Sequence, residues 1–367
     1  SRLQCVRRKE LSAWVALNSI EGLGPSRIME LVCAAGSAQA VLQQPSRWGK
    51  CLPRSALLGD CPLSLWARAR EEMAKLRKVG GRALACYSPR WPAELKALEK
   101  PPPVLHLQGS GKVLLPEAKR VTIIGARACT PYGRAQAARF GAGIAAAGAV
   151  VVSGGARGID QAAMRGALDV GGKVLAVVGA GLDRPYPSEA RRLYEQIVNQ
   201  GGTVLSEFNC GVPPRRGNFP RRNRIMAVLA HSILVIQASR KSGTFSTLSH
   251  VEDWAASICA VPGPVDCAVS AGPNYLIQQG CRLVQNPEEV MDSLCPWTLV
   301  EPDPEQDEIL VALSGGDRRS EDLALELGIT QKAIRYRLSD LELGGQVSRL
   351  QGGLYHRCQR KSLKPPC

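Results

Sequence analysis

Six short runs rich in β-branched and small apolar residues alternate with helix-like stretches between Val121 and Leu294, and this alternation constrains the fold more than any other feature. Strands separated by amphipathic helices form βαβ units, which build a parallel sheet with helices on both faces. We therefore expect an α/β fold with a parallel, Rossmann-like sheet core. The runs are Val121–Ala126, Val150–Gly155, Lys173–Gly179, Thr203–Phe208, Ser232–Ala238 and Ser257–Val261.

Two smaller segments flank this core. Residues 1 to about 80 have the apolar spacing of helices, and a Pro-rich strip and an apolar run at Val104–Leu107 separate them from the sheet. After an acidic, proline-broken linker at Glu301–Glu308, Ser320 is expected to cap a helix, and a Gly-Gly hairpin at Val347–Tyr355 is typical of a winged helix. A winged helix reads DNA or docks proteins, and the sequence leaves both open. We predict domains at residues 1–82, 83–296 and 305–358.

The N-terminal segment contains a turn with a specific form, Ile20–Ile28. Gly22 and Gly24 bracket an apolar residue, and Pro25 then starts a helix. This pattern is typical of a helix-hairpin-helix, whose backbone N–H groups meet DNA phosphates. It also fits a helix corner used only for packing, and the two interpretations stay open.

The chain has a formal net charge of +15, which favours a polyanionic partner such as nucleic acid or an anionic surface. An arginine-rich genome would give the same excess. We see no secretory signal. A transmembrane helix needs about 18 consecutive apolar residues, and no uncharged apolar run in the sequence is that long. The 13 cysteines form no Cys-x-x-Cys pair and the four histidines lie far apart, so we expect no metal site and a reducing cytoplasm.

Two strand-to-helix junctions combine small residues with arginine. The first, Gly125–Gly133, includes Arg127, and the second is Ser153–Asp160. Ligands of parallel sheets bind at the carboxyl ends of strands, where helix N-termini and arginines hold phosphate. Two such loops at neighbouring strand ends predict one cationic, glycine-lined pocket, in which Asp160 is a helix N-terminal carboxylate. The residues expected there are Gly125, Arg127, Ser153, Gly154, Arg157 and Gly158.

A third feature is Arg215–Arg224, which places five arginines in ten residues around Phe219. Arginines for phosphates and an aromatic ring for bases indicate single-stranded nucleic acid. A solvated loop would explain the charge but not an exposed Phe. The turn Lys241–Thr244 offers the Ser242 and Thr244 hydroxyls to a phosphate, or serves only as a helix cap.

Several catalytic signatures are missing from the sequence. It contains no Walker motif, no G-x-G-x-x-G followed by an acid and no G-x-S-x-G. Asp183 and Glu207 are the only credible catalytic acids at strand ends, and a role as caps or arginine partners fits them better. The sequence therefore favours binding over catalysis.

Together these motifs resemble the DNA-processing protein A (DprA or Smf) family, over about Ala85–Leu294 and, with both flanking segments, nearly the whole chain. The resemblance implies an extended Rossmann fold with a SAM-like or helix-hairpin-helix front and a winged-helix tail. It implies a cytoplasmic bacterial protein that binds single-stranded DNA in natural transformation, forms a homodimer and helps load the RecA recombinase. The family is not known as an enzyme, and it implies no cofactor, metal or membrane.

The resemblance also assigns site residues. Arg127 matches the arginine of the family's Gly-Ser-Arg loop, although Ala126 replaces the serine, and Gly155 replaces a leucine in the second loop. Phe219 is placed for base contact. After Thr244 the chain departs from the family pattern, so that helix start is altered. The remaining matched residues are Gly154, Arg157, Gly158, Asn218, Arg221, Arg222, Ser242, Gly243 and Thr244.

An alternative is a nucleotide-processing enzyme of the nucleoside monophosphate phosphoribohydrolase type, built on a related Rossmann-like fold. Ser242–Thr244 and Glu252 are similar to that family's glycine-rich loop and catalytic glutamate. An enzyme acting on free nucleotides has little need for clustered arginines, a hairpin motif or a winged helix. We keep it as the second hypothesis.

Overall fold

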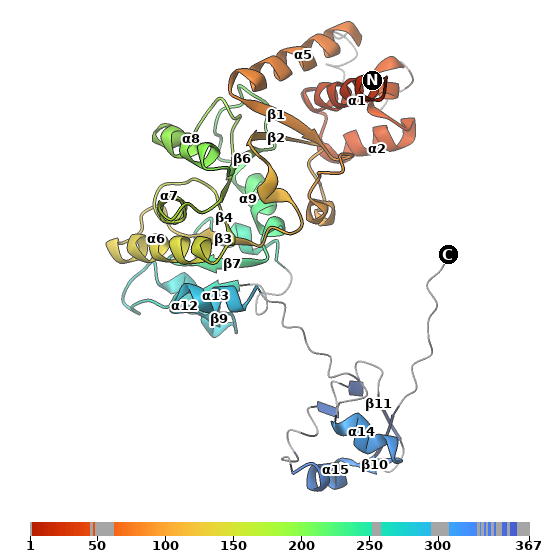
Figure 1. Cartoon of the computed structure of the whole chain (residues 1–367), viewed down its shortest axis with the longest axis vertical. Coiled ribbons are helices and arrows are strands. Elements are labelled where there is room, and N and C mark those ends of the chain that lie inside the picture. Colours follow the sequence, from red (N-terminus) through yellow and green to blue (C-terminus); the bar gives the residue numbers. More distant parts are fainter. Residues whose placement is uncertain are drawn as a thin grey trace. The chain divides into compact units, whose positions relative to one another are not determined.

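The chain divides into two compact units, Ser1–Leu294 and Cys295–Cys367, which are described separately (Figure 1). The computed structural model describes residues 2–44, 47, 62–251, 258–294 and 308–328 and, further on, 331, 334, 337–338, 341–342, 347–350 and 353–357. None of the helices in these parts combines the length and apolar character needed to cross a bilayer. The three domain ranges predicted from the sequence stay predictions.

The first unit begins with helices, as expected: α1 (Arg2–Asn18), α2 (Pro25–Ala35), α3 (Ala38–Gln43) and α5 (Pro62–Lys78). Pro25 occupies the start of α2, and Gly36 ends it in the left-handed conformation at φ 82°. Ile20 and Leu23 in the turn before α2 are buried. The turn is therefore a packed corner, and its contact with DNA stays a prediction.

The core of this unit is a nine-stranded sheet in the order β1-β2-β6-β5-β4-β3-β7-β8-β9. Strands β3 to β9 run parallel, which confirms the predicted core. The sequence did not predict that β1 and β2 extend one edge antiparallel. The strands are β1 Gly81–Ala85, β2 Val104–Gly109, β3 Arg120–Ile124, β4 Val150–Ser153, β5 Val174–Val178, β6 Thr203–Ser206, β7 Ser232–Val235, β8 Ile258–Ala260 and β9 Arg282–Leu283.

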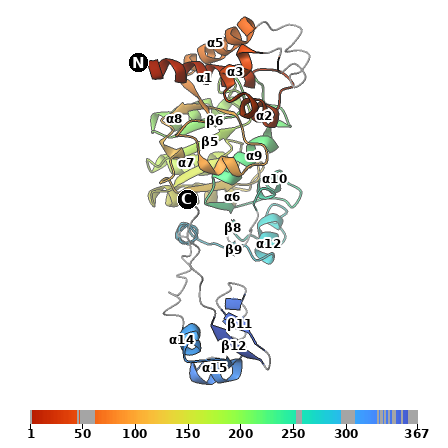
Figure 2. The same ribbon diagram turned by 90° about the vertical axis from the view of Figure 1, so that its right-hand side faces the viewer.

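Helices cover both faces of the sheet (Figure 1). Strand residues alternate between two apolar clusters: Ile123 belongs to the same cluster as Phe140 of α6, and Ile124 to the same cluster as Ile225 of α9. Figure 2 shows the N-terminal helices at one end of the unit and β8 and β9 at the other. The helices are α6 Pro131–Ala146, α7 Ile159–Asp169, α8 Arg191–Asn199, α9 Asn218–Leu229, α10 Phe245–Leu248, α12 Ala271–Gln278 and α13 Pro287–Asp292, with short 3₁₀ turns η2 Ala93–Ala97, η3 Lys112–Leu114 and η4 Ser188–Ala190.

The second unit is small and has its own core, which includes Ile309, Leu323, Ile334 and Leu338. Its wing is the predicted hairpin, with β11 (Val347–Arg349) antiparallel to β12 (Leu354–Arg357), and β10 (Arg318–Arg319) pairs with the other side of β12. The helices are α14 (Glu308–Ser314) and α15 (Ser320–Glu326). Helix α15 starts at Ser320 with Arg319 in the cap position, so the predicted Ser320 cap is wrong.

Candidate nucleic-acid interface

The two predicted glycine-arginine loops lie side by side at the carboxyl ends of β3 and β4. Gly158 adopts φ 84°, and a Cβ there would lie 2.4 Å from the Ala126 carbonyl oxygen. The backbones of the two loops therefore touch at a position that only glycine fits. This contact brings Arg127 and Arg157 to one hollow of about 240 Å³, which Ala128, Ala156, Tyr186 and Pro187 complete.

Arg222 of α9 forms the buried base of this region. Its side chain is only 4% exposed, and its Nη1 donates to the Val177 carbonyl oxygen at the end of β5 over 2.5 Å. Gly154 leaves the room for it, because a Cβ there would lie 1.9 Å from Nη1. The Nε atom has no hydrogen-bond partner among the described residues. A buried donor without a partner is unfavourable, so the Nε–H of Arg222 is still available to donate a hydrogen bond.

A second cavity joins Arg222 to the aromatic residues. It holds only about 10 Å³ and is lined by Gly154, Gly179, Tyr186, Phe219 and Arg222, among others. That volume takes nothing larger than a water-sized group. A phosphate would have to sit in the outer hollow, with Arg222 acting from behind.

The charges of the site act on one another. Burial raises the pKa of Asp160 to about 6, although the positive charges of Arg222 and Arg127 oppose the rise. Burial also lowers the pKa of Arg222, and the Asp160 carboxylate partly restores it while Arg127 lowers it further. Arg127 and Arg222 therefore repel each other across the pocket, and an anion between them would relieve that repulsion.

An aromatic pair lies beside the arginines: Tyr186 lines both cavities, and Phe219 lines the smaller one. The centres of the Phe219 and Tyr186 rings are 5.7 Å apart, and the Arg127 guanidinium carbon lies 5.1 Å from the centre of the Phe219 ring. Phe219 belongs to the first turn of α9 and is half-buried, so the prediction of an exposed Phe in a loop is wrong. Tyr186 is 44% exposed and was not predicted as a site residue. Tyr186 lies in the stretch Gly179–Pro187, whose residue pattern does not indicate contact with a phosphate or a base.

Several predicted residues are placed elsewhere. The Ser153 side chain is fully buried and donates to the Ile123 carbonyl oxygen over 2.7 Å, so it does not line the hollow. The Asn218 amide donates to Gly179 and Pro213 carbonyl oxygens at 3.0 and 3.2 Å, which makes it a support for the loop. Arg221 turns toward the Phe208 ring, 5.0 Å away, and toward the Glu207 carboxylate.

The turn at Ser242–Thr244 lies against Asn223 of α9 instead of lining the two cavities. The Ser242 hydroxyl is buried without a hydrogen-bond partner among the described residues, and Gly243 is exposed. Thr244 makes no side-chain cap hydrogen bond. Glu252, the candidate catalytic residue of the alternative hypothesis, lies outside the described residues.

The two acids at strand ends have structural partners, as the sequence suggested. Glu207 is almost completely buried and pairs with Arg224 of α9. The Asp183 carboxylate accepts from the Gly211 N–H over 2.7 Å. Burial raises the pKa of Glu207, and the nearby arginines oppose this rise.

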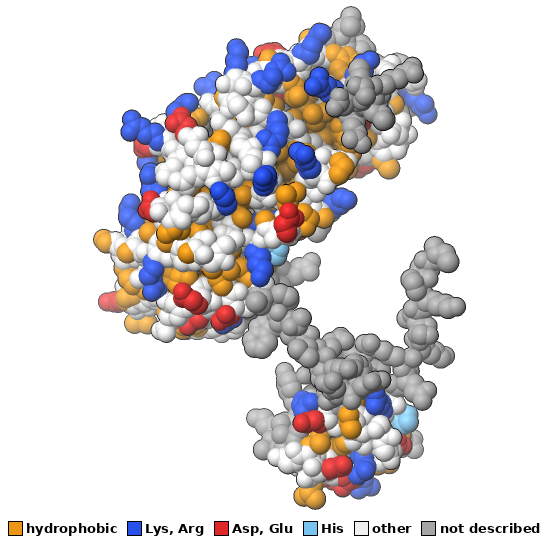
Figure 3. Space-filling model, viewed as in Figure 1, with side chains coloured by type: hydrophobic (Ala, Val, Ile, Leu, Met, Phe, Trp, Pro, Cys, Tyr) orange, Lys and Arg blue, Asp and Glu red, His pale blue; other side chains and the backbone are white. Residues whose placement is uncertain are grey.

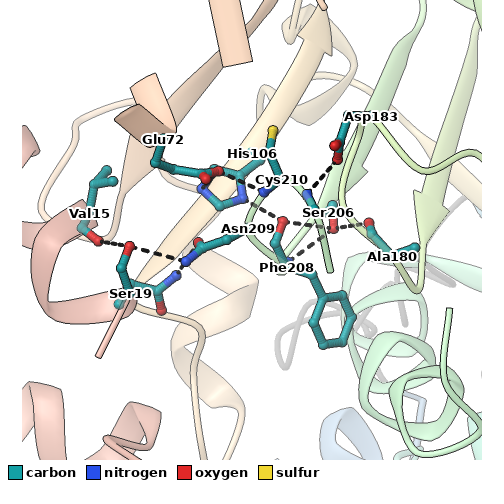
Figure 4. Close-up of polar contacts among 12 residues, drawn as sticks. Val15, Ser19, Glu72, His106, Ala180, Asp183, Ser206, Phe208, Asn209 and Cys210 are labelled. Atoms are coloured by element: carbon teal, nitrogen blue, oxygen red, sulfur yellow. Dashed lines mark hydrogen bonds and ion pairs between the residues drawn. The ribbon is translucent and has the colours of Figure 1, made fainter. Parts of the chain in front are cut away.

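The segment Phe208–Gly211, which leads from β6 to α9, is anchored by residues from distant parts of the chain (Figure 4). The Cys210 N–H donates to Glu72 of α5 over 2.7 Å, and the Asn209 amide donates to the Ser19 hydroxyl over 3.1 Å. His106 of β2 donates through Nδ1 to the Phe208 carbonyl oxygen over 2.8 Å, and burial lowers its pKa to about 4. The N-terminal helices thus help to hold the chain that carries Phe219 and Arg222.

Comparison with known proteins gives the family of this fold and site. The family model of DNA recombination-mediator protein A matches residues 82–295, which include every loop of the pocket. The chain belongs to this family. The model of the DprA winged helix domain matches residues 296–353, in agreement with the hairpin and helices of the second unit.

Family relatives cover most of the chain. Protein Smf of Escherichia coli (strain K12) is 34% identical over 285 residues, which are 74% of this chain and 75% of that protein. The X-ray structure of DprA from Streptococcus pneumoniae has a TM-score of 0.58 and 27% identity, and covers 76% of this chain and 95% of its own. The DprA structure from Helicobacter pylori has a TM-score of 0.52 and 29% sequence identity. The match covers 58% of this chain and 95% of that one, and that protein was described for a unique mode of binding single-stranded DNA.

Proposed function

We propose that the chain is a single-stranded DNA-binding protein that acts by binding and not by catalysis. The observation that carries this proposal is the convergence of Arg127, Arg157 and Arg222, from three separate elements, on one edge of the sheet beside Tyr186 and Phe219. The DNA binding described for the Helicobacter pylori relative supports it. So does the net charge of +15, and Figure 3 shows Lys and Arg side chains spread over the N-terminal unit with few Asp and Glu.

The geometry suggests separate roles for the three arginines. Arg127 and Arg157 border the outer hollow and would contact a phosphate directly. Arg157 is paired with Glu189 on the surface, where an ion pair contributes little, so a phosphate can replace the carboxylate. Arg222 would supply buried positive charge behind the phosphate, where screening by salt is weak.

The aromatic pair favours a single strand over a duplex. A base must leave its stack before its face can meet Tyr186 or Phe219. Stacking on a ring suits every base, so we expect little sequence preference. In a duplex the bases are stacked and paired, and only the phosphate contacts would remain.

We infer the cellular role from membership of the family. The protein would act in the cytoplasm as a homodimer, protect an incoming single strand and help to load RecA onto it during transformation or recombination. The DNA contact tested below comes before all of these steps.

Fluorescence anisotropy with labelled oligo-dT and a matching duplex, over a salt series, tests the proposal. We expect tight binding that prefers the single strand and weakens steeply with salt, because bound arginines release counterions. Preference for the duplex would move the binding site to the hairpin turn or the winged helix. Absence of binding at low salt would contradict the proposal.

The second hypothesis, hydrolysis of nucleoside monophosphates, has a separate test. Family membership and the separation of Ser242–Thr244 from the two cavities favour DNA binding over it. Release of free base from AMP, abolished by Glu252→Gln, would restore the enzymatic hypothesis. Absence of base release together with oligo-dT binding would leave only the binding function.

A further inference from the structure

A third and larger hollow lies away from the two cavities of the arginine pocket. It measures about 840 Å³ and is bordered by β1, the turn after β1 and the turn that connects β2 to η3. Gly109 at the end of β2 pairs with Thr203, the first residue of β6. The hollow therefore reaches the amino ends of the parallel strands, whereas Arg127 and Arg222 lie at their carboxyl ends. We call it the edge groove, because β1 is the outermost strand of the sheet on this side.

The lining of the edge groove combines an apolar floor with a basic rim. Leu11, Leu84 and Leu115 line it and are partly exposed, and the buried Leu107 and Leu114 lie beneath them. None of the described residues that line the groove is acidic. Four of them are cationic, and all four are exposed: Arg8, Arg82, Arg90 and Lys112.

Two of the rim cations, Arg82 and Arg90, lie close enough for their positive charges to act on each other. The Arg82 guanidinium is fixed, because Nη2 donates to the Ser110 carbonyl oxygen over 2.7 Å and Nη1 to Gly109. Burial, and after it the positive charge of Arg90, lowers the pKa of Arg82. An anionic group in the groove would relieve this repulsion.

We propose that the edge groove binds an acidic peptide segment of a partner protein, with one or two large apolar side chains seated on the leucine floor. Charge complementarity requires an anionic occupant. The volume lies within the roughly 300–1,000 Å³ of sites that hold a small ligand or a few side chains. A nucleic acid fits less well, because the floor is aliphatic and Tyr87 is the only aromatic side chain in the part of the lining that the structure describes.

The test uses the full chain and a fluorescein-labelled peptide, Asp-Asp-Leu-Glu-Glu-Phe, followed by anisotropy. One control peptide, Asn-Asn-Leu-Gln-Gln-Phe, lacks the charges, and another, Asp-Asp-Gly-Glu-Glu-Gly, lacks the apolar side chains. The variant Arg90→Glu with Lys112→Glu reverses two rim charges. Its matched control is Lys78→Glu with Lys119→Glu, which changes the net charge equally at exposed positions outside the groove.

We expect the acidic, apolar peptide to bind more tightly than either control peptide. The rim variant should weaken this binding by about tenfold or more, because like charges would face the peptide, whereas the control variant should keep it. The rim variant should also keep its affinity for oligo-dT. Equal binding of the peptide by all variants, or no binding, would overturn the proposal. Displacement of the peptide by oligo-dT that is lost in the rim variant would assign the groove to nucleic acid and overturn it as well.

Discussion

Arg120 and Arg222 are both buried arginines, but they lie at opposite ends of the central strands and have different surroundings. Arg120 opens β3 and is fully buried, and its guanidinium donates to the Leu229 and Leu115 carbonyl oxygens at 2.7 and 3.0 Å and pairs with Glu94. Arg222 donates to the Val177 carbonyl oxygen, its Nε has no partner in the described part of the chain, and the buried Asp160 carboxylate lies nearby. Burial alone therefore does not distinguish the two arginines, and it is the incomplete hydrogen bonding beside a cavity that leads us to propose Arg222 as the DNA-binding one.

We expect the largest effect, a loss of stability, for Arg120→Met. This change leaves two buried carbonyl oxygens without a donor and removes the partner of Glu94, so we expect the free energy of unfolding to fall by about 3–5 kcal/mol. Urea denaturation measures it. Lys119→Met, at the exposed neighbour, should stay within about 0.5 kcal/mol of the native value. Normal stability of Arg120→Met would remove the distinction between the two arginines.

For Arg222→Met we expect the opposite pattern. Loss of the buried charge should weaken oligo-dT binding by about 2–5 kcal/mol, while the free energy of unfolding falls less than in Arg120→Met, because Asp160 can take up a proton. Anisotropy and urea denaturation of the same preparation separate the two effects. Arg216→Met, at an exposed position of the same arginine cluster, is the control. A variant that is destabilised but binds DNA normally would make Arg222 structural.

Phe219→Ala should remove a stacking surface without removing charge. We expect a loss of about 1–3 kcal/mol in binding free energy for oligo-dT and an unchanged salt dependence. Titrations at several salt concentrations measure both quantities. Phe219→Tyr, which keeps the ring, should bind normally. A changed salt slope in the alanine variant would mean that Phe219 acts by orienting Arg127.

Arg127→Ala should change the salt dependence instead. Loss of one phosphate contact lowers the slope of log K against log salt by about 0.7 for a single strand. Oligonucleotides of different sequence should be weakened equally, because phosphate contacts carry no base information. A slope equal to that of the native protein would remove Arg127 from the DNA contact.

The smallest effect concerns pH. Burial raises the pKa of Asp160 to about 6, so this carboxyl takes up a proton as the pH falls from 7 to about 5. Loss of its negative charge leaves Arg222 and Arg127 less compensated, and oligo-dT should bind more tightly at the lower pH. Asp160→Asn should bind more tightly at pH 7 and lose this increment. An increment that persists unchanged in the variant would place the titrating group elsewhere.

Much of the fold was predictable because the periodicity of the apolar residues and the spacing of the strand-like runs indicate alternating strands and helices. Each predicted run overlaps an observed parallel strand, although β3 begins one residue earlier, at Arg120, and the two-residue β9 was not predicted. The runs extend into loops because small residues continue past the last ladder hydrogen bond. The antiparallel edge was not predictable in the same way. Val104–Leu107 lacks clear alternation since both of its faces are buried. Strand β1 contains no β-branched residue and follows α5 closely, so its sequence does not stand out from that of a helix.

The site was only partly predictable, because side-chain direction decides it. Arg221 and Arg222 are adjacent in the sequence, yet a helix turns them about 100° apart, so one meets Glu207 and the other the pocket. The pleat of β4 likewise turns the Ser153 hydroxyl into the sheet. Tyr186 gave no signal, since its role comes from its contact with Phe219.

The most direct test of the account is photo-cross-linking of an oligonucleotide with 5-bromodeoxyuridine in place of thymidine to the full chain, followed by mass spectrometry of the peptides. A base that stacks beside the arginine pocket should cross-link to Tyr186 or Phe219, and Arg222→Met should reduce the yield. Cross-links confined to the turn at Ile20–Ile28 or to the winged helix would contradict the central claim that the carboxyl edge of the sheet is the DNA-binding site.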